Sequence, residues 1–117
     1  MLEILSMMGC SVQFENGIAL IDTRGLNTHI VPEKLVRKIR SSIILMGAVL
    51  QRTGQVEVAY PGGCEIGHRP IDLHLKGLRK LGVEITEKNG LLVGKVKEPA
   101  ACDIHLDYPS VGATENI

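Results

Sequence analysis

The stretch LEILSMMGCSVQFENGIALI (residues 2–21) aligns without a gap onto LKGLRKLGVEITEKNGLLVG (residues 75–94). The two stretches share leucines at helical spacing, a glycine after them, and an Asn-Gly pair. The matched positions are Leu2 with Leu75, Leu5 with Leu78, Gly9 with Gly82, and Asn16-Gly17 with Asn89-Gly90. The offset of 73 residues is too long for the short solenoid repeats. We therefore expect one domain with two copies of a structural unit, residues 1–74 and about 75–117, the second copy being incomplete.

Each copy reads as a helix followed by a hairpin. In the second copy, leucines recur at helical spacing up to Leu81, and Gly82 suits the left-handed position that ends a helix. Apolar and polar residues then alternate, and Asn89-Gly90 is a strong signal for a type I′ hairpin turn. A further strand is expected in each copy, at residues 28–31 and 103–106.

The first copy continues into a second helix and a strand. Pro32 suits the first turn of a helix. The apolar stripe on this helix consists of Leu35, Ile39, Ile43, Met46 and Leu50. The strand VEVAY (residues 56–60) follows. The pattern predicts an α/β chain of α+β repeats. The chain stops at SVGATENI, where the second copy of this helix should begin, so it looks cut from a longer repeat protein.

Composition limits the function classes. Thirteen Lys and Arg balance thirteen Asp and Glu, and the chain has one Phe, two Tyr and no Trp. Neutral charge and few aromatic residues argue against nucleic-acid binding. No apolar run approaches the roughly 20 residues of a membrane-spanning helix, and the N-terminus lacks the basic start of a signal peptide. Three cysteines at irregular spacing favour a reducing cytoplasm over a disulfide scaffold.

The stretch AYPGGCEIGHRP (residues 59–70) places Cys64 in a glycine-rich loop before a helix that should open near Pro70. A helix N-terminus offers N–H groups to an anion, and Arg69 adds a guanidinium suited to phosphate or carboxylate. Arg37 and Arg40, three residues apart on the earlier helix, would add to this positive charge if that helix packs near the loop. A thiol in such surroundings has its thiolate stabilised, so Cys64 is a candidate working thiol.

Structural interpretations compete with this one. A free cysteine is most often a small buried apolar residue, and we expect this of Cys10 and Cys102. Cys64, His68 and His74 have the spacing C-x3-H-x5-H, but no second cysteine or fourth ligand accompanies them, so no metal site is expected. His74 is interpreted as a helix-face residue. No nucleotide phosphate-loop or dinucleotide fingerprint occurs, and no cofactor is expected.

Three stretches together resemble UDP-N-acetylglucosamine enolpyruvyl transferases, which catalyse the first committed step of bacterial peptidoglycan synthesis. They are PGGCEIGHRPIDLHLKGLRKLG (61–82), the upstream VRKIRSSIILMGAVLQRTGQVEVAYPGGC (36–64) and the downstream DYPSVGATENI (107–117). The resemblance covers essentially the whole chain. It implies part of a two-domain inside-out α/β barrel with three copies of the repeat in each domain. The chain would then be a fragment of one domain.

The resemblance also implies a reaction. The enolpyruvyl group of phosphoenolpyruvate moves onto the 3′-hydroxyl of UDP-N-acetylglucosamine, and phosphate leaves. Cys64 matches the family's loop cysteine, which is the proton donor, forms a covalent adduct with phosphoenolpyruvate, and is alkylated by fosfomycin. A thiol that titrates near neutral pH suits general-acid work, and a glycine-rich loop suits a lid.

Further site residues carry over by position. Arg69 matches the arginine near the phosphate groups. The residues matching the UDP-sugar site are Arg40, Arg69, Pro70, Ile71, Asp72, Leu73, Ser110, Val111 and Gly112, with Asp72 near the uracil and the last three forming a diphosphate-binding turn. The chain departs from some family members at Tyr108, where they have a lysine. The shikimate-pathway sister enzyme shares the fold but lacks this cysteine loop.

The resemblance implies that the active site needs both domains, so the isolated chain is expected to be inactive. A different class of function is also open: a non-catalytic module that binds the UDP-sugar, or one that associates with itself through the open ends of its sheet.

Overall fold

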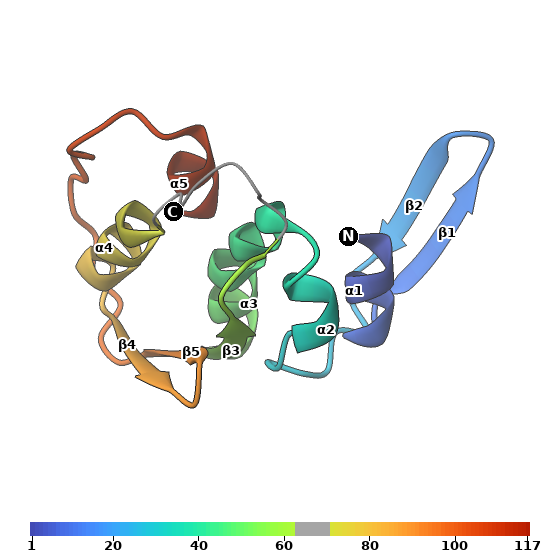
Figure 1. Cartoon of the computed structure of the whole chain (residues 1–117), viewed down its shortest axis with the longest axis horizontal. Helices are drawn as coiled ribbons and strands as arrows, with labels where there is room; N and C mark the ends of the chain where they lie inside the picture. Colours follow the sequence, from blue (N-terminus) through green and yellow to red (C-terminus); the bar gives the residue numbers. More distant parts are fainter. Residues whose placement is uncertain (63–70) are drawn as a thin grey trace.

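The computed structural model describes residues 1–62 and 71–117 (Figure 1). It contains both helices and strands in a mixed α/β arrangement. In chain order they are α1 (Leu2–Met7), β1 (Ser11–Glu15), β2 (Ile18–Asp22), α2 (Glu33–Val36), the 3₁₀ helix η1 (Arg40–Ile44), α3 (Leu45–Thr53), β3 (Gln55–Ala59), α4 (Asp72–Lys80), β4 (Val83–Lys88), β5 (Leu91–Val96) and α5 (Val111–Asn116).

The helix and hairpin predicted for each repeat copy are confirmed. Helix α1 leads into the hairpin β1–β2, and helix α4 leads into the hairpin β4–β5. Both helices end before a glycine with positive φ, 94° at Gly9 and 87° at Gly82. Both Asn-Gly pairs have positive φ at both residues, as a type I′ turn requires.

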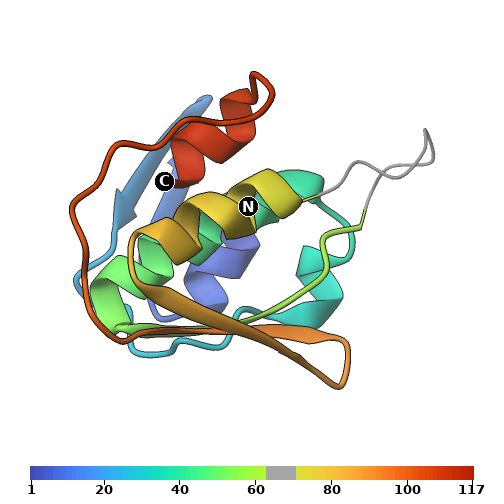
Figure 2. The ribbon, with the colours of Figure 1, turned by 90° about the vertical axis from the view of Figure 1, so that its left-hand side faces the viewer.

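The core lies between a three-stranded sheet and the helices above it. The strands are antiparallel in the order β3–β5–β4. Helices α3 and α4 cover one face of this sheet, and α5 lies beyond them (Figures 1 and 2). The buried side chains are aliphatic, including Val56, Val58 and Leu92 from the sheet and Met46 and Leu78 from the helices. This agrees with a chain that has few aromatic residues.

The long second helix was predicted wrongly. The segment after Pro32 forms the short helix α2, then η1, then α3. The backbone at Ile39 is extended, with φ −131° and ψ 111°, and this ends the first helical segment. The buried Ser42 hydroxyl donates to the carbonyl of Ile39, 2.5 Å away, so a side chain takes up a backbone acceptor at the break.

The two further strands, expected at residues 28–31 and 103–106, do not form. Residues 28–31 contribute only a single parallel bridge, from Ile30 to Glu57 in β3, and residues 103–106 form no strand. A strand needs a neighbour with which to pair. Residues 28–31 lie beside β3, whereas residues 103–106 pair with no described strand.

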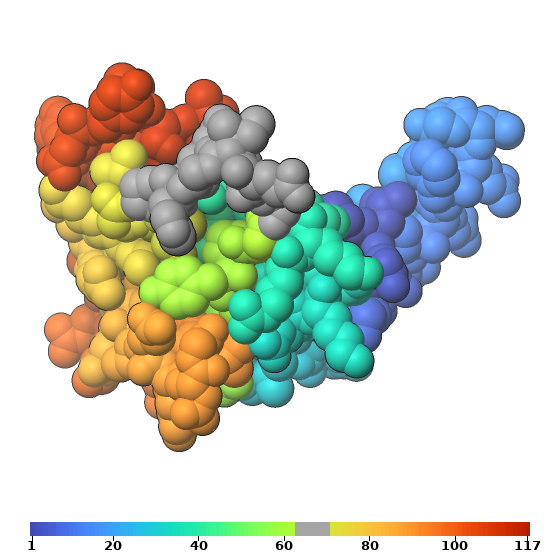
Figure 3. Space-filling view, viewed as in Figure 1, coloured from blue at the N-terminus to red at the C-terminus, as the bar shows by residue number. Residues whose placement is uncertain are grey.

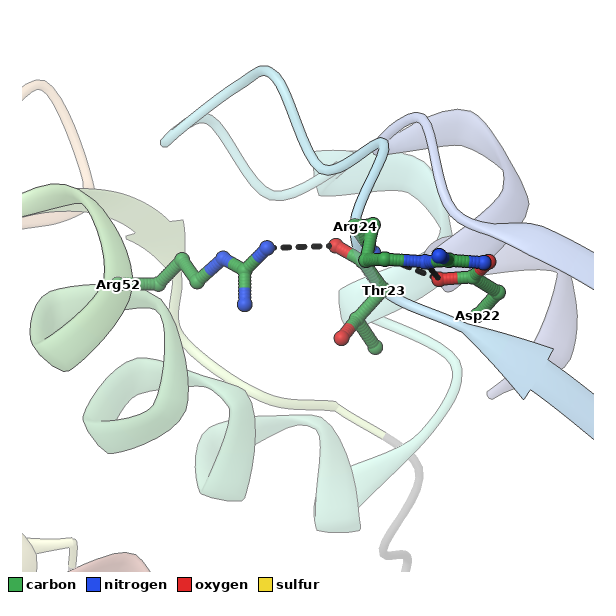
Figure 4. Close-up of polar contacts among 4 residues, drawn as sticks. All are labelled: Asp22, Thr23, Arg24 and Arg52. Carbon is green, nitrogen blue, oxygen red and sulfur yellow. Dashed lines mark hydrogen bonds and ion pairs between the residues drawn. The ribbon is translucent and has the colours of Figure 1, made fainter.

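The hairpin β1–β2 projects from the body of the molecule (Figures 1 and 3). Its apolar side chains are exposed, among them Phe14 (62%), Ile18 and Leu20. The loop after β2 is held to the body by Arg52 of α3, which donates to the Thr23 carbonyl over 3.2 Å (Figure 4). Beside it, Arg24 pairs with Asp22, and the side-chain hydrogen bond from Arg24 lowers the pKa of that carboxyl.

Candidate substrate-binding cavity

A cavity of about 710 Å³ opens where η1, α4 and α5 meet. Its wall combines a cation, a hydroxyl, an imidazole and apolar groups. The lining residues are Arg40, Ser41, Ile43, Ile44, Leu73, His74, Tyr108, Pro109, Ser110 and Gly112. These residues come from segments up to 72 positions apart in the sequence, so only the folded chain brings them together.

The N-terminal ends of α4 and α5 form two sides of this cavity. Helix α4 begins after Ile71, whose side chain is buried in the core and fixes the start of the helix. Helix α5 begins after Ser110, whose hydroxyl oxygen accepts a hydrogen bond from the Ala113 N–H over 3.2 Å. The Ser110 O–H remains able to donate to a ligand, because a hydroxyl can accept and donate at once.

Helix α5 is held in place by glycines and one asparagine. It packs against Gly47 of α3 and Gly77 of α4, where an added methyl group would collide with Asn116 and Ile117 respectively. The Asn116 side chain is 4% exposed. Its Oδ1 accepts from the Gly47 N–H over 2.9 Å, and its Nδ2 lies 3.1 Å from Nδ1 of His74. One amide therefore joins α3, α4 and α5 behind the cavity.

The cavity is positively charged at one side. Arg40 is partly buried in its wall, and within residues 1–62 and 71–117 it has no carboxylate partner at ion-pair distance. Burial lowers the pKa of the neighbouring His74, the Arg40 charge lowers it further, and Asp72 opposes both. Near neutral pH the site thus offers one guanidinium cation and one neutral imidazole.

Comparisons with known proteins identify the family. A family model described as EPSP synthase (3-phosphoshikimate 1-carboxyvinyltransferase) matches residues 1–117. The chain belongs to this family. It is 52% identical over its whole length to UDP-N-acetylglucosamine 1-carboxyvinyltransferase 2 of Caldanaerobacter subterraneus subsp. tengcongensis, and 47% identical to UDP-N-acetylglucosamine 1-carboxyvinyltransferase 1 of Carboxydothermus hydrogenoformans. It spans 28% of the length of each of these carboxyvinyltransferases.

The fold of the EPSP synthase family is found as well. The crystal structure of the enolpyruvyl transferase NikO from Streptomyces tendae matches with a TM-score of 0.73 at 19% identity, over 88% of this chain and 22% of NikO. The predicted mixed α/β fold, as part of the larger enolpyruvyl transferase fold, is confirmed. The resemblance to UDP-N-acetylglucosamine enolpyruvyl transferases is confirmed too. None of the described helices is long and apolar enough to cross a membrane.

The cavity brings together four of the residues that the enolpyruvyl transferase resemblance suggested. Arg40, Leu73, Ser110 and Gly112 all line it. Three others do not: Ile71 is a core residue, Asp72 is exposed at the start of α4, and Val111 is exposed on α5. Cys64, Arg69 and Pro70 lie outside the described residues.

The sequence interpretation missed three residues of this site. His74 was taken for a helix-face residue, but it is buried and lines the cavity. Tyr108 was mentioned only because some family members have a lysine at this position, but its side chain lines the cavity. Asn116 was not singled out. The sequence offered one signal for two of them, which was their closeness to residues already suggested for the site. His74 directly follows Leu73, and Asn116 lies on the same short helix as Gly112.

The expected contribution of Arg37 concerned the Cys64 loop, which lies outside the described residues. Arg37 forms an ion pair of 2.7 Å with Glu33 and does not line the cavity that holds Arg40. One further expectation is wrong. Cys102 is exposed, with its thiol 3.4 Å from the Lys80 carbonyl, while Cys10 is buried as predicted. Across residues 1–62 and 71–117, no cluster of three metal-ligating side chains occurs.

Proposed function

We propose that this chain is the part of a UDP-N-acetylglucosamine 1-carboxyvinyltransferase that holds the UDP-sugar. The observation that carries the proposal is the cavity wall, which joins Arg40 to the N-terminal turn of α5 through Ser110 and Gly112. The identity of 52% to an enzyme named for this substrate supports the choice of ligand.

The wall suits a nucleotide diphosphate. The Arg40 guanidinium supplies positive charge and a planar set of donors for phosphate oxygens. The Ser110 hydroxyl adds a donor, and Gly112 leaves its backbone uncovered by a side chain. Leu73 and Tyr108 offer apolar surface to a ring. The neutral state of His74 avoids a second cation beside Arg40.

The chemical step is assigned to Cys64 and Arg69, on the resemblance alone. The thiol of Cys64 would donate a proton to carbon 3 of phosphoenolpyruvate while the sugar 3′-hydroxyl bonds to carbon 2 and gives up its own proton. The resulting ketal then loses phosphate from carbon 2 and one proton from carbon 3, which restores the double bond of the enolpyruvyl group, with Arg69 near the phosphate oxygens. The described chain bounds this segment at Gly62 and at Ile71, directly before α4, whose first turns reach the cavity. We propose a cytoplasmic setting, which agrees with three cysteines at irregular spacing.

Calorimetric titration of UDP-N-acetylglucosamine into the 117-residue chain tests the proposal. Removing a hydrogen-bonding charge typically costs about 1.5–3 kcal/mol, so Arg40→Ala should weaken binding by about tenfold to a hundredfold. Arg37→Ala is the matched control, because Arg37 is a nearby arginine that pairs with Glu33 instead. Equal affinity of the two variants, or no binding by the unaltered chain, would overturn the assignment. Phosphate release should be absent, because the chain spans only part of its relatives.

A second candidate, self-association, is favoured by the hairpin β1–β2. In its register Val12 faces Ile21 and Phe14 faces Ala19, so these four side chains share one apolar face. Exposed contiguous apolar surface favours association. Sedimentation velocity should show oligomers that Phe14→Lys converts to monomers. A monomeric unaltered chain at high concentration would refute this candidate.

A further inference from the structure

The Asn116 side chain fixes which nitrogen of His74 carries the proton. The backbone N–H of Gly47 can only donate, so the Asn116 atom 2.9 Å from it must be the oxygen. The amide nitrogen then faces His74 Nδ1 over 3.1 Å. An amide NH₂ can also only donate, so Nδ1 must accept. A neutral imidazole with an accepting Nδ1 carries its proton on Nε2.

The protonated nitrogen faces the cavity. The Cε1–Nε2 edge of the ring lies against Gly112, where an added Cβ would be 3.4 and 3.6 Å from these two atoms. Among the described residues His74 has one hydrogen-bond partner, Asn116, and there no side-chain nitrogen or oxygen is both sealed from solvent and unpaired. Nε2 is therefore open to the cavity that His74 lines.

We propose that Asn116 is a positioning residue that holds His74 neutral with its proton on Nε2, so that this N–H donates a hydrogen bond to the diphosphate of a nucleotide in the cavity. The inference rests on the proposed function for its ligand, but not for the state of the ring. A neutral donor adds a directed hydrogen bond beside Arg40 without placing a second buried cation there. An imidazolium would also turn an Nδ1–H against the amide NH₂ of Asn116.

Nitrogen NMR of the ¹⁵N-histidine-labelled chain tests the state of the ring. At pH about 8, where an unperturbed histidine is neutral, Nε2 should show the shift of a protonated nitrogen and Nδ1 that of a bare one. The resonances are assigned by their loss in His74→Gln. A proton on Nδ1, or the tautomer mixture of a free imidazole, overturns the inference from the unaltered chain alone.

Asn116→Asp provides the inverse test. The carboxylate has nearly the same shape and can still accept from Gly47, but its second oxygen can only accept from His74. The proton should therefore appear on Nδ1. Thr114→Asp adds the same charge to the exposed side of α5 and should leave the His74 resonances unchanged. Persistence of a bare Nδ1 in Asn116→Asp would show that Asn116 does not set the tautomer.

Titration with UDP separates this inference from the proposed function. UDP should shift the His74 Nε2–H resonance. His74→Leu should weaken UDP binding by about tenfold to a hundredfold, as expected for a hydrogen bond to a charged group. His74→Gln, whose amide nitrogen can take the place of Nε2, should restore most of the affinity. If Arg40→Ala abolishes binding but both His74 variants bind normally, the proposed function stands and this inference fails. If the unaltered chain does not bind UDP, the proposed function fails, and with it the donor role of His74.

Discussion

The close contact between α3 and α5 gives a sharp prediction for Gly47→Ala. The added methyl group would lie 2.9 Å from Asn116 Oδ1 and closer still to the Asn116 backbone oxygen, whereas ordinary contacts begin at 3.4 Å. Helix α5 must therefore move away from α3. Overpacking of this kind costs about 1–3 kcal/mol, and losing the Gly47 hydrogen bond costs about 0.5–1.5 kcal/mol. The gain in helix propensity returns about 1 kcal/mol. The net loss should be roughly 1–3 kcal/mol.

Gly77→Ala is the matched control. Gly77 is also a helical glycine beneath α5, but there the new methyl group meets the far end of the Ile117 side chain, which can rotate away. This variant should be as stable as the unaltered chain, or more stable by up to about 1 kcal/mol. Urea unfolding followed by circular dichroism measures both variants. Because α5 carries Ser110 and Gly112, Gly47→Ala should also weaken UDP binding. If Gly47→Ala loses no stability, α5 does not dock against α3 as described.

Three further predictions concern pH, turns and thiols. The pKa of His74 lies below its ordinary value of 6.5, so as the pH is lowered the unfolded chain takes up this proton before the folded chain does. Below about pH 6.5 the free energy of unfolding should therefore decrease as the pH decreases, and it should decrease less steeply in His74→Gln. Gly90→Ala places a side chain at φ 74° and should lower the unfolding free energy by about 1 kcal/mol, whereas Gly17→Ala, in the projecting hairpin, should alter global unfolding less. Maleimide should label the exposed Cys102 in the folded chain and leave Cys10 unmodified until it unfolds, and equal labelling rates would contradict the burial of Cys10.

The sequence predicted the local structure well where a residue dictates a backbone conformation. The Asn-Gly turns and the glycines that end α1 and α4 are of this kind, because positive φ is costly for most other residues. Prediction failed where tertiary contacts decide. The stripe from Leu35 to Leu50 is periodic enough for one helix, but the chain breaks at Ile39. Periodicity reports which residues are buried, and a broken helix can bury the same ones.

The candidate site was predictable only in part for a similar reason. The resemblance supplied Arg40, Leu73, Ser110 and Gly112, which match known motifs of the family. It gave no reason to choose His74, whose burial and ring orientation depend on Asn116, 42 positions further on. Cys102 was misjudged because a cysteine near an expected strand was assumed to be buried, and that strand does not form.

The two repeat copies differ at the point where α5 packs against α4. Gly77 matches Ile4, which is fully buried in α1, and the missing side chain at Gly77 leaves the space that Ile117 occupies. The second copy therefore has a glycine in place of a buried isoleucine at the point where α5 packs against α4. Gly77→Ile should therefore leave α4 and its hairpin folded, displace α5, and lower UDP affinity far more than Gly77→Ala. Unchanged affinity in Gly77→Ile would mean that the cavity does not need α5 at this position.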